Sequence, residues 1–332
     1  MKKIITCTGY GTTGSSVVTD LLKEFDDVSS LGDYEYRFLF DPNGVKELEI
    51  ALKYLNNRQN SDFYIKQFLK YIDYLSKSPM YKYYEKTFDN KFKIESEKFI
   101  SNIIEIKWDG YWHRDIMSEN IFIKSLYYLE RAIQKKILKQ NESSAVIYKN
   151  TMYYSYYDEK KFVKNVKEYL NNLILLLNKK ENFIVFDQLV PPENIKDFSK
   201  YFDDIKVIIV DRDPRDIYTL EKFKYKEKFG PYKDLNSYIE WHKLIRKSRD
   251  KENENENVLV LNFEDFIYFY EETVDKLLKF LSIEKEKWIM KKKYFNPDIS
   301  KKNTKVWEQY SEIKKEIEII ETELSDYLYS KY

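Results

Sequence analysis

The sequence has little cysteine, histidine or glycine for a chain of 332 residues. Its one cysteine, Cys7, excludes an internal disulfide framework and a cysteine-rich zinc site. With only two histidines, His113 and His242, a metal centre is poorly supported, so no metal is expected. The 31 tyrosines against 7 glycines indicate compositional drift and not a stacking platform for nucleic acid.

The chain also lacks a charge bias and a long apolar run. The formal net charge is +1, so no global field recruits nucleic acid or a membrane surface, and any anion site must be local. Nowhere are there about 18 consecutive apolar residues, so no membrane span is expected. The apolar stretch after Lys2 and Lys3 ends after about five residues, which is short for a secretory signal. We therefore expect a cytoplasmic protein.

Five short apolar runs predict the strands of a parallel sheet. Helical patterns separate the runs, as in strand–helix repeats wound around one sheet, and each run brings polar residues to the same edge. The prediction is an α/β, P-loop-like, three-layer fold with a parallel sheet of about five strands. The runs are Ile4–Ile5, Val28–Leu31, Phe183–Phe186, Val207–Val210 and Val258–Leu261.

A long helical stretch separates the second run from the third. Apolar residues recur at helical spacing from Val45 to Leu138, and the next convincing strand pattern is Val146–Tyr148. We predict one domain over residues 1–332, with a helical insertion at about 45–145. Its segment Trp108–Arg114 is interpreted as a packed loop between helices; the alternatives are a platform for a sugar ring, or His113 as a base.

The turn Gly9–Ser16 lies between the first predicted strand and a helix. Its glycines let the backbone approach a ligand, and its N–H groups and hydroxyls are expected to donate toward one point, which suits a phosphate or sulfate. The spacing matches a P-loop except that Ser15 stands where a nucleotide triphosphatase has lysine, which argues against ordinary ATP chemistry. The alternative is a plain glycine-rich turn with serine caps. The expected donors are Gly11, Thr12, Thr13, Gly14, Ser15 and Ser16.

Glu35 and Arg37 lie just past the second predicted strand, two positions apart. Residues at the carboxyl end of a strand in an open α/β sheet face the ligand crevice, so both side chains are expected to point into one site. A surface ion pair is the alternative.

Four segments together resemble the sulfotransferase family, which uses 3′-phosphoadenosine 5′-phosphosulfate (PAPS) as co-substrate. They frame nearly the whole chain, and RDPRD after an apolar strand is the most distinctive. The resemblance implies that the first loop cradles the 5′-phosphosulfate and that Arg212 binds the 3′-phosphate, as a bidentate guanidinium suits a phosphate. It also implies contributions from Lys301, Lys302 and Asn303. The segments are GYGTTGSS, VIIVDRDPRDIY, VLVLNFEDFI and FNPDISKKNTKVW.

The chain departs from the family pattern at two positions. Many members have a lysine or arginine inside the first loop, where this chain has Thr12, and a serine on the helix after the RDP motif, where it has Leu220. Arg37 is the candidate for the first role and Thr219 for the second. The alternative to phosphate binding by Arg212 is a surface ion pair with a neighbouring aspartate.

In glycan-directed sulfotransferases the base is a glutamate soon after the second strand, and Glu35 has the matching place; His113 is the second candidate. We therefore expect transfer of a sulfuryl group to a hydroxyl or amine of a saccharide or glycoconjugate. The alternatives are a P-loop-type kinase without the usual lysine, in which Lys149 or Arg246 supplies the charge, and a sulfotransferase-like binding protein without turnover.

Overall fold

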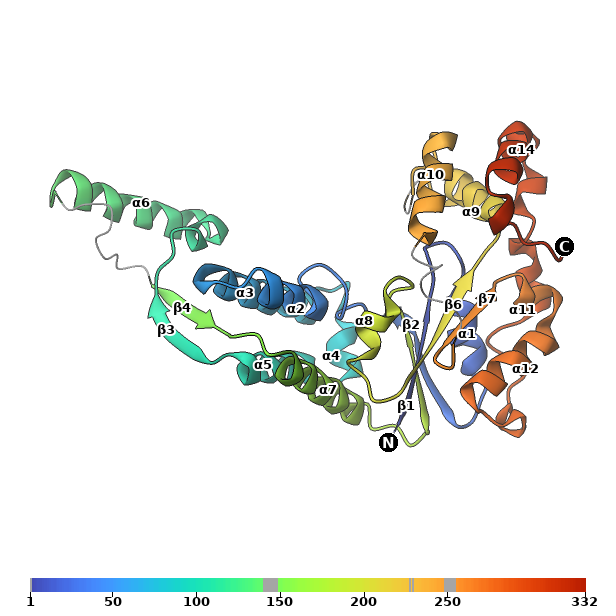
Figure 1. Ribbon diagram of the computed structural model, residues 1–332, viewed down its shortest axis with the longest axis horizontal. Coiled ribbons are helices and arrows are strands. Elements are labelled where there is room, and N and C mark those ends of the chain that lie inside the picture. Colours follow the sequence, from blue (N-terminus) through green and yellow to red (C-terminus); the bar gives the residue numbers. More distant parts are fainter. Residues whose placement is uncertain (1, 140–148, 227, 229, 248–254) are drawn as a thin grey trace. The chain divides into compact units, whose positions relative to one another are not determined.

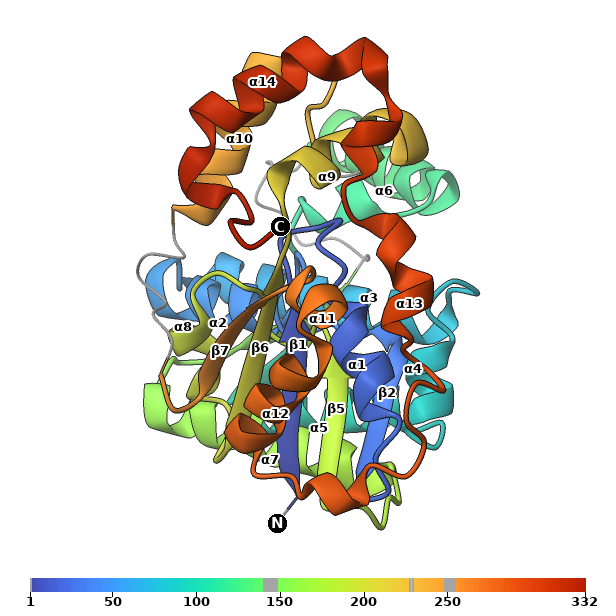
Figure 2. The same ribbon diagram turned by 90° about the vertical axis from the view of Figure 1, so that its right-hand side faces the viewer.

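Five parallel strands form the central sheet. The computed structural model describes residues 2–139, 149–226, 228, 230–247 and 255–332. The strand order is β2-β5-β1-β6-β7, and all four neighbouring pairs are parallel (Figure 2), so the predicted α/β class and the five-stranded parallel sheet are confirmed. The strands are β1 (Lys3–Thr8), β2 (Val28–Glu35), β5 (Phe183–Asp187), β6 (Ile205–Asp211) and β7 (Val258–Asn262).

The chain divides into two compact units, labelled by element in Figure 1. The first unit is Met1–Asp41 with Asn178–Tyr332 and contains the parallel sheet, and the second is Pro42–Leu177. No described helix is both long and apolar enough to cross a bilayer. The helices of the first unit are α1 (Ser16–Leu22), α8 (Ile195–Ser199), α9 (Pro214–Leu220), α10 (Leu235–Arg246), α11 (Asp265–Tyr268), α12 (Tyr270–Leu281), α13 (Pro297–Ser300) and α14 (Lys314–Glu323).

Helices α1 and α12 pack on one face of the sheet. In β1 the alternate residues Ile5 and Cys7 join the same buried cluster as the apolar faces of these two helices. The other residues of β1 after Lys3 are buried as well, because β1 is a central strand covered on both faces. In α12 the buried residues follow the helical period, which places one apolar stripe against the sheet; they are Val274, Leu277, Leu278 and Leu281.

Strand β2 is longer than its apolar run predicts. The run Val28–Leu31 gives only the first half, and the strand continues to Glu35 through half-buried and exposed residues. The register with β5 shifts between Ser30 and Glu35, after which Glu35 lies opposite Asp187. Apolar patterning could not show this extension because its side chains are not in the core.

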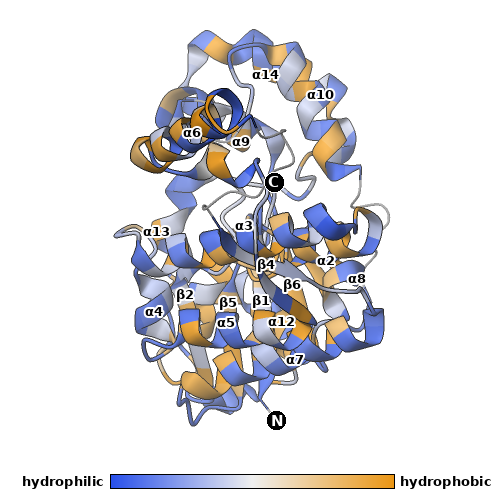
Figure 3. Cartoon of the chain, turned by 90° about the vertical axis from the view of Figure 1, so that its left-hand side faces the viewer, coloured by the Kyte–Doolittle hydropathy of each residue, from blue (hydrophilic) through white to orange (hydrophobic). Residues whose placement is uncertain are grey.

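The second unit holds the predicted helices and one small sheet. Orange and blue residues alternate along α6 and α7 in Figure 3, as expected for helices with one apolar face. The predicted strand at Val146–Tyr148 lies outside the described residues. The elements are α2 (Val45–Tyr54), α3 (Arg58–Lys77), α4 (Tyr83–Thr87), α5 (Phe92–Ile103), β3 (Ile106–Gly110), η1 (Asp115–Ser118), α6 (Ile121–Lys136), β4 (Asn150–Tyr154) and α7 (Glu159–Leu176).

The loop predicted at Trp108–Arg114 is partly wrong. Trp108 and Gly110 lie on β3, which pairs with β4 as an antiparallel ribbon in which Trp108 faces Met152. The pattern missed this strand because four of its five residues are exposed, so no alternation of apolar and polar side chains marks it. His113 follows the strand and is exposed.

The carboxylate of Glu24 fastens the C-terminal part of the first unit. Glu24 is fully buried after α1, and its two oxygens accept four hydrogen bonds. The donors are the Trp288 indole at 2.8 Å and the backbone N–H groups of Lys292, Tyr294 and Phe295 at 2.8–3.0 Å. A buried carboxylate is tolerated when donors surround it in this way.

We expect Glu24→Gln to lower the free energy of unfolding by about 2–4 kcal/mol, because an amide keeps one acceptor oxygen and turns an NH₂ group toward N–H donors. Urea unfolding followed by circular dichroism measures it. The exposed Glu272→Gln on α12 is the matched control and should change stability by less than about 0.5 kcal/mol. Equal effects of the two substitutions would contradict the role given to Glu24.

Candidate functional site

The turn after β1 has a backbone that only glycine fits at two positions. Gly14 has φ +79°, and a Cβ there would lie 2.8 Å from the Phe263 ring. A Cβ on Gly9 would lie 2.8 Å from the carbonyl oxygen of Val210. Among the described residues, none accepts a hydrogen bond from the backbone N–H groups of residues 11–16. These donors remain available at the carboxyl edge of the sheet, where an anion would satisfy them.

The hydroxyls of this turn do not converge as the sequence predicts. Thr12 has φ +56°, and its hydroxyl donates to the buried carboxylate of Glu221 in the π-helical turn η2 (Glu221–Tyr225). The Ser15 hydroxyl accepts from the Gln188 amide at 3.3 Å, and Thr13 is buried. Backbone amides, more than hydroxyls, therefore make up the donor set of the turn.

Arg212 joins this turn to the C-terminal segment. It follows β6, is 6% exposed, and lies 4.8 Å above the Phe263 ring. Its Nη1 donates to the carbonyl of Thr12 at 3.3 Å, and its Nη2 donates to the carbonyl of Asn303 in η5 (Lys301–Asn303). Its buried Nε has no hydrogen-bond partner among the described residues. Neutral carbonyl acceptors thus hold the guanidinium beside the turn, and its Nε–H remains unused.

Arg212 is not a member of a surface ion pair, which was the alternative interpretation. Its closest carboxylate oxygen belongs to Asp216 and lies 4.0 Å from Nε. That carboxylate is turned to the backbone N–H groups of Lys305 and Val306, at 3.1 and 2.6 Å. The pairing expected for the motif involves Arg215, whose guanidinium binds Asp213 at 2.7 Å.

The other predicted phosphate ligands lie around Arg212 with different surroundings. The Thr219 hydroxyl is fully buried and donates to the carbonyl of Arg215 one helical turn earlier, at 2.7 Å. Asn303 contacts Arg212 through its backbone, while Lys301 and Lys302 are exposed on η5. The structure therefore brings Asn303 to Arg212 and leaves the two lysines at the surface.

Glu35 and Arg37 form an ion pair at the end of β2 with side chains 53% and 45% exposed, which is the arrangement named as the alternative, a surface ion pair. Arg37 Nη1 is 3.5 Å from Glu35, and its Nε donates to Asp41 at 2.8 Å. Opposite Glu35 on β5 is Asp187, which is 8% exposed and accepts a hydrogen bond from the Cys7 thiol at 3.2 Å. Burial raises the pKa of Asp187 to about 7, and the charge of Glu35 adds to the shift.

Sequence reasoning did not select Asp187 or its neighbour Gln188, although both end an apolar strand. Gln188 accepts from Thr8 at 3.0 Å and donates to Ser15, so it ties the end of β5 to the turn. The signal available in the sequence was their position, since the carboxyl ends of parallel strands meet at one edge. His113 belongs to the second unit, whereas the turn, Arg212 and Glu35 belong to the first.

Arg246 is already bound within the first unit. It is 1% exposed, its Nη2 and Nε donate to Asp211 at 2.7 and 3.1 Å, and it lies over the Tyr10 ring. It therefore does not replace the lysine that a kinase would need. Within the described part of the chain, no three histidine, cysteine, aspartate or glutamate side chains are grouped so as to hold a metal ion.

Glu264 is a second buried carboxyl at this edge. It is fully buried after β7 and accepts from the backbone N–H of Asp213 at 2.9 Å, and its Oε2 has no hydrogen-bond partner among the described residues. Burial raises the pKa of Glu264 to about 8, against the opposing charge of Arg212. The fold therefore favours the protonated form.

Because the folded-state pKa of Glu264 lies above its unfolded value, its contribution is present in acid and is lost as the pH rises through about 8. We expect Glu264→Gln to gain about 2–3 kcal/mol of stability relative to the wild type between pH 6 and pH 9, because the wild type must ionise the buried carboxyl over this range and the amide does not. Denaturant unfolding at both pH values measures it. A stability difference that stays constant with pH would contradict burial of a neutral carboxyl.

No protein-family model matches the chain, and no curated protein matches it in sequence. Solved structures similar to it include the following three. The sulfotransferase domain of the curacin biosynthetic pathway is 13% identical with TM-score 0.43, covering 98% of this chain and 97% of that one. The sulfotransferase domain of the Synechococcus PCC 7002 olefin synthase is 12% identical with TM-score 0.40, covering 89% and 78%. A sulfotransferase from Mycobacterium tuberculosis H37Rv is 10% identical with TM-score 0.34, covering 91% and 76%.

Proposed function

We propose that the chain is a sulfotransferase that moves a sulfuryl group from PAPS to a hydroxyl or amine of a saccharide or glycoconjugate. One observation carries the proposal. Arg212, buried at the end of β6, donates to the carbonyl of Thr12 in the amide-lined turn that follows β1, the neighbouring strand. In this arrangement the Arg212 guanidinium and the backbone amides of the turn can bind two separate anionic groups of one nucleotide, its 3′-phosphate and its 5′-phosphosulfate.

In this proposal the turn holds the 5′-phosphosulfate and Arg212 holds the 3′-phosphate. The backbone amides of residues 11–16 supply hydrogen bonds without a lysine, and their glycines permit the close approach. Arg212 exchanges neutral carbonyl acceptors for phosphate oxygens and gains a partner for its unused Nε. Asn303, and Lys301 and Lys302 on the same short helix, contribute from the C-terminal segment.

Glu35 is the proposed base, and Arg37 the cation that balances charge beside it. The acceptor oxygen or nitrogen bonds to sulfur as the bond from sulfur to the bridging phosphate oxygen breaks, and Glu35 takes the proton that the acceptor loses. The Glu35 side chain is 53% exposed and accessible to an acceptor. Asp187 beside it is buried and holds a proton below about pH 7.

A binding protein without turnover is the second candidate, and the contact between Thr12 and Glu221 favours it. At the position where many sulfotransferases carry a cation, this chain has a hydroxyl that donates to a carboxylate. A negative charge there opposes departure of an anionic leaving group. The two candidates share nucleotide binding and differ only in transfer.

We expect Arg212→Ala to weaken binding of adenosine 3′,5′-bisphosphate by about 1.5–3 kcal/mol, or roughly 10- to 150-fold, because a charge-assisted hydrogen-bond partner is lost. Isothermal calorimetry on the full chain measures the change, with Arg58→Ala on α3 as the matched control. Tighter binding of ATP than of the bisphosphate would favour the kinase, and bisphosphate binding without transfer of labelled sulfate would favour the binding protein.

We expect Glu35→Gln to lower kcat for sulfate transfer by about 10²- to 10⁴-fold, because the amide cannot accept the acceptor's proton. Asp187→Asn should lower kcat by less than about tenfold, since the amide preserves a neutral buried group. Initial rates with labelled PAPS and a panel of saccharides compare the two. The reverse order of effects would move the base to Asp187, and bisphosphate binding should be unchanged in both variants.

A further inference from the structure

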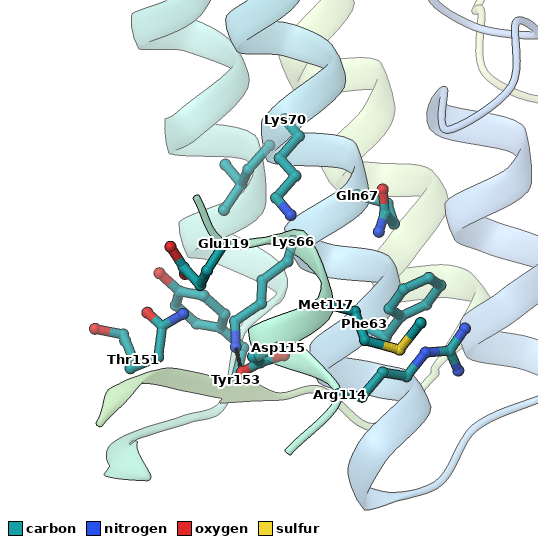
Figure 4. Close-up of a pocket in the computed structure, with 12 residues that line it drawn as sticks. Phe63, Lys66, Gln67, Lys70, Arg114, Asp115, Met117, Glu119, Thr151 and Tyr153 are labelled. Carbon is teal, nitrogen blue, oxygen red and sulfur yellow. Dashed lines mark hydrogen bonds and ion pairs between the residues drawn. The ribbon is translucent and has the colours of Figure 1, made fainter. Parts of the chain in front are cut away.

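The second unit contains a pocket of about 520 Å³, within the size range of small-molecule sites. One face of α3 supplies Phe63, Lys66, Gln67 and Lys70, which recur at helical spacing. The rest of the lining comes from β4 and from the segment around η1 (Figure 4). All of its described lining residues belong to the second unit, whereas the residues proposed to bind PAPS belong to the first.

An ion-pair cluster forms a fixed part of this pocket. Lys66 Nζ lies 2.9 Å from Asp115 in η1 (Figure 4). It also lies 2.7 Å from the fully buried Asp62, one helical turn earlier on α3. Asp62 also accepts the backbone N–H of Tyr153 at 2.9 Å, which ties α3 to β4. The charges of Lys66 and Asp115 are thus engaged within the protein.

Two cations of the lining have no carboxylate partner. Among the described residues, no carboxylate lies within ion-pair distance of Lys70 or Arg114. The Arg114 guanidinium instead stacks on the Phe63 ring, at 4.6 Å from its centre, which fixes the plane of the cation and leaves its N–H donors for a ligand. These two cationic groups therefore favour an anionic ligand.

The remaining lining suits a polyhydroxylated ring. Phe63 and Tyr153 offer aromatic surface, and Gln67 and Asn150 offer amide groups. Amides bind hydroxyls as both donor and acceptor, and aromatic faces pack on apolar C–H surface. We propose that this pocket binds a saccharide that carries an anionic substituent, either a carboxylate or a sulfate ester.

The test measures binding to the full chain without nucleotide, by calorimetry or ligand-observed NMR. The probes are a disaccharide with one glucuronate, a disaccharide with one sulfate ester and no carboxylate, and the uncharged disaccharide. We expect one or both anionic probes to bind at least tenfold more tightly than the uncharged one. Comparison of the glucuronate probe with the sulfate-ester probe shows which anion is preferred. Equal binding of all three, or no binding of any, would overturn the proposal.

A double variant assigns the binding to the two cations. We expect Lys70→Gln with Arg114→Gln to weaken binding of the preferred probe at least tenfold while the circular dichroism spectrum and Tm stay those of the wild type. Arg58→Gln with Lys82→Gln removes the same charges from the same unit outside the pocket and should leave binding unchanged. If the first variant loses its fold, the single variant Arg114→Lys is the test. Lysine keeps the positive charge but lacks the planar pair of N–H donors of the guanidinium. Undiminished affinity of this variant for both anionic probes would overturn the proposal.

The outcome is independent of the proposed transfer reaction. Arg212→Ala should leave saccharide binding at wild-type affinity because Arg212 belongs to the first unit. Failure of bisphosphate binding with intact saccharide binding would therefore reject the PAPS site alone. Failure of saccharide binding in a chain that binds the bisphosphate would reject the pocket alone.

Discussion

The first unit depends on how one buried cation is held. Arginine is cationic in proteins, and burying the Arg212 guanidinium with its nearest carboxylate 4.0 Å away is costly unless its N–H donors are used. Two of them reach Thr12 and Asn303, which lie nearly the whole chain apart. The same guanidinium therefore positions the turn after β1 against the C-terminal segment. It also retains a positive charge at the edge where the strands end.

The sheet explains why so much of this arrangement could be predicted from sequence. Strands β1, β5, β6 and β7 are buried on both faces or nearly so, and such strands appear as continuous apolar runs. Polar residues after each run then meet at one edge because the strands are parallel. This rule placed the glycine turn and Arg212 at that edge, while the glycine spacing and the resemblance of the RDPRD segment supplied their expected roles.

The parts that could not be predicted lack such a pattern. The exposed strand β3 carries no apolar alternation, and the end of β2 continues through polar residues. Hydrophobic periodicity does not show which strands are neighbours in a sheet. The sequence therefore did not predict that Glu35 lies opposite Asp187. The bond from Thr12 to Glu221 joins positions far apart in the chain, and nothing local to either residue signals it.

The strand order has a consequence for synthesis of the chain. Among the strands that the structure describes, β1 pairs with β5 and β6, and β2 pairs with β5. Neither early strand therefore has its partner until about 150 more residues have been made. The second unit is continuous in sequence and emerges complete in that interval. The second unit can therefore fold first during synthesis. Until β5 and β6 are made, the apolar β1 segment remains unpaired and can aggregate or bind chaperones.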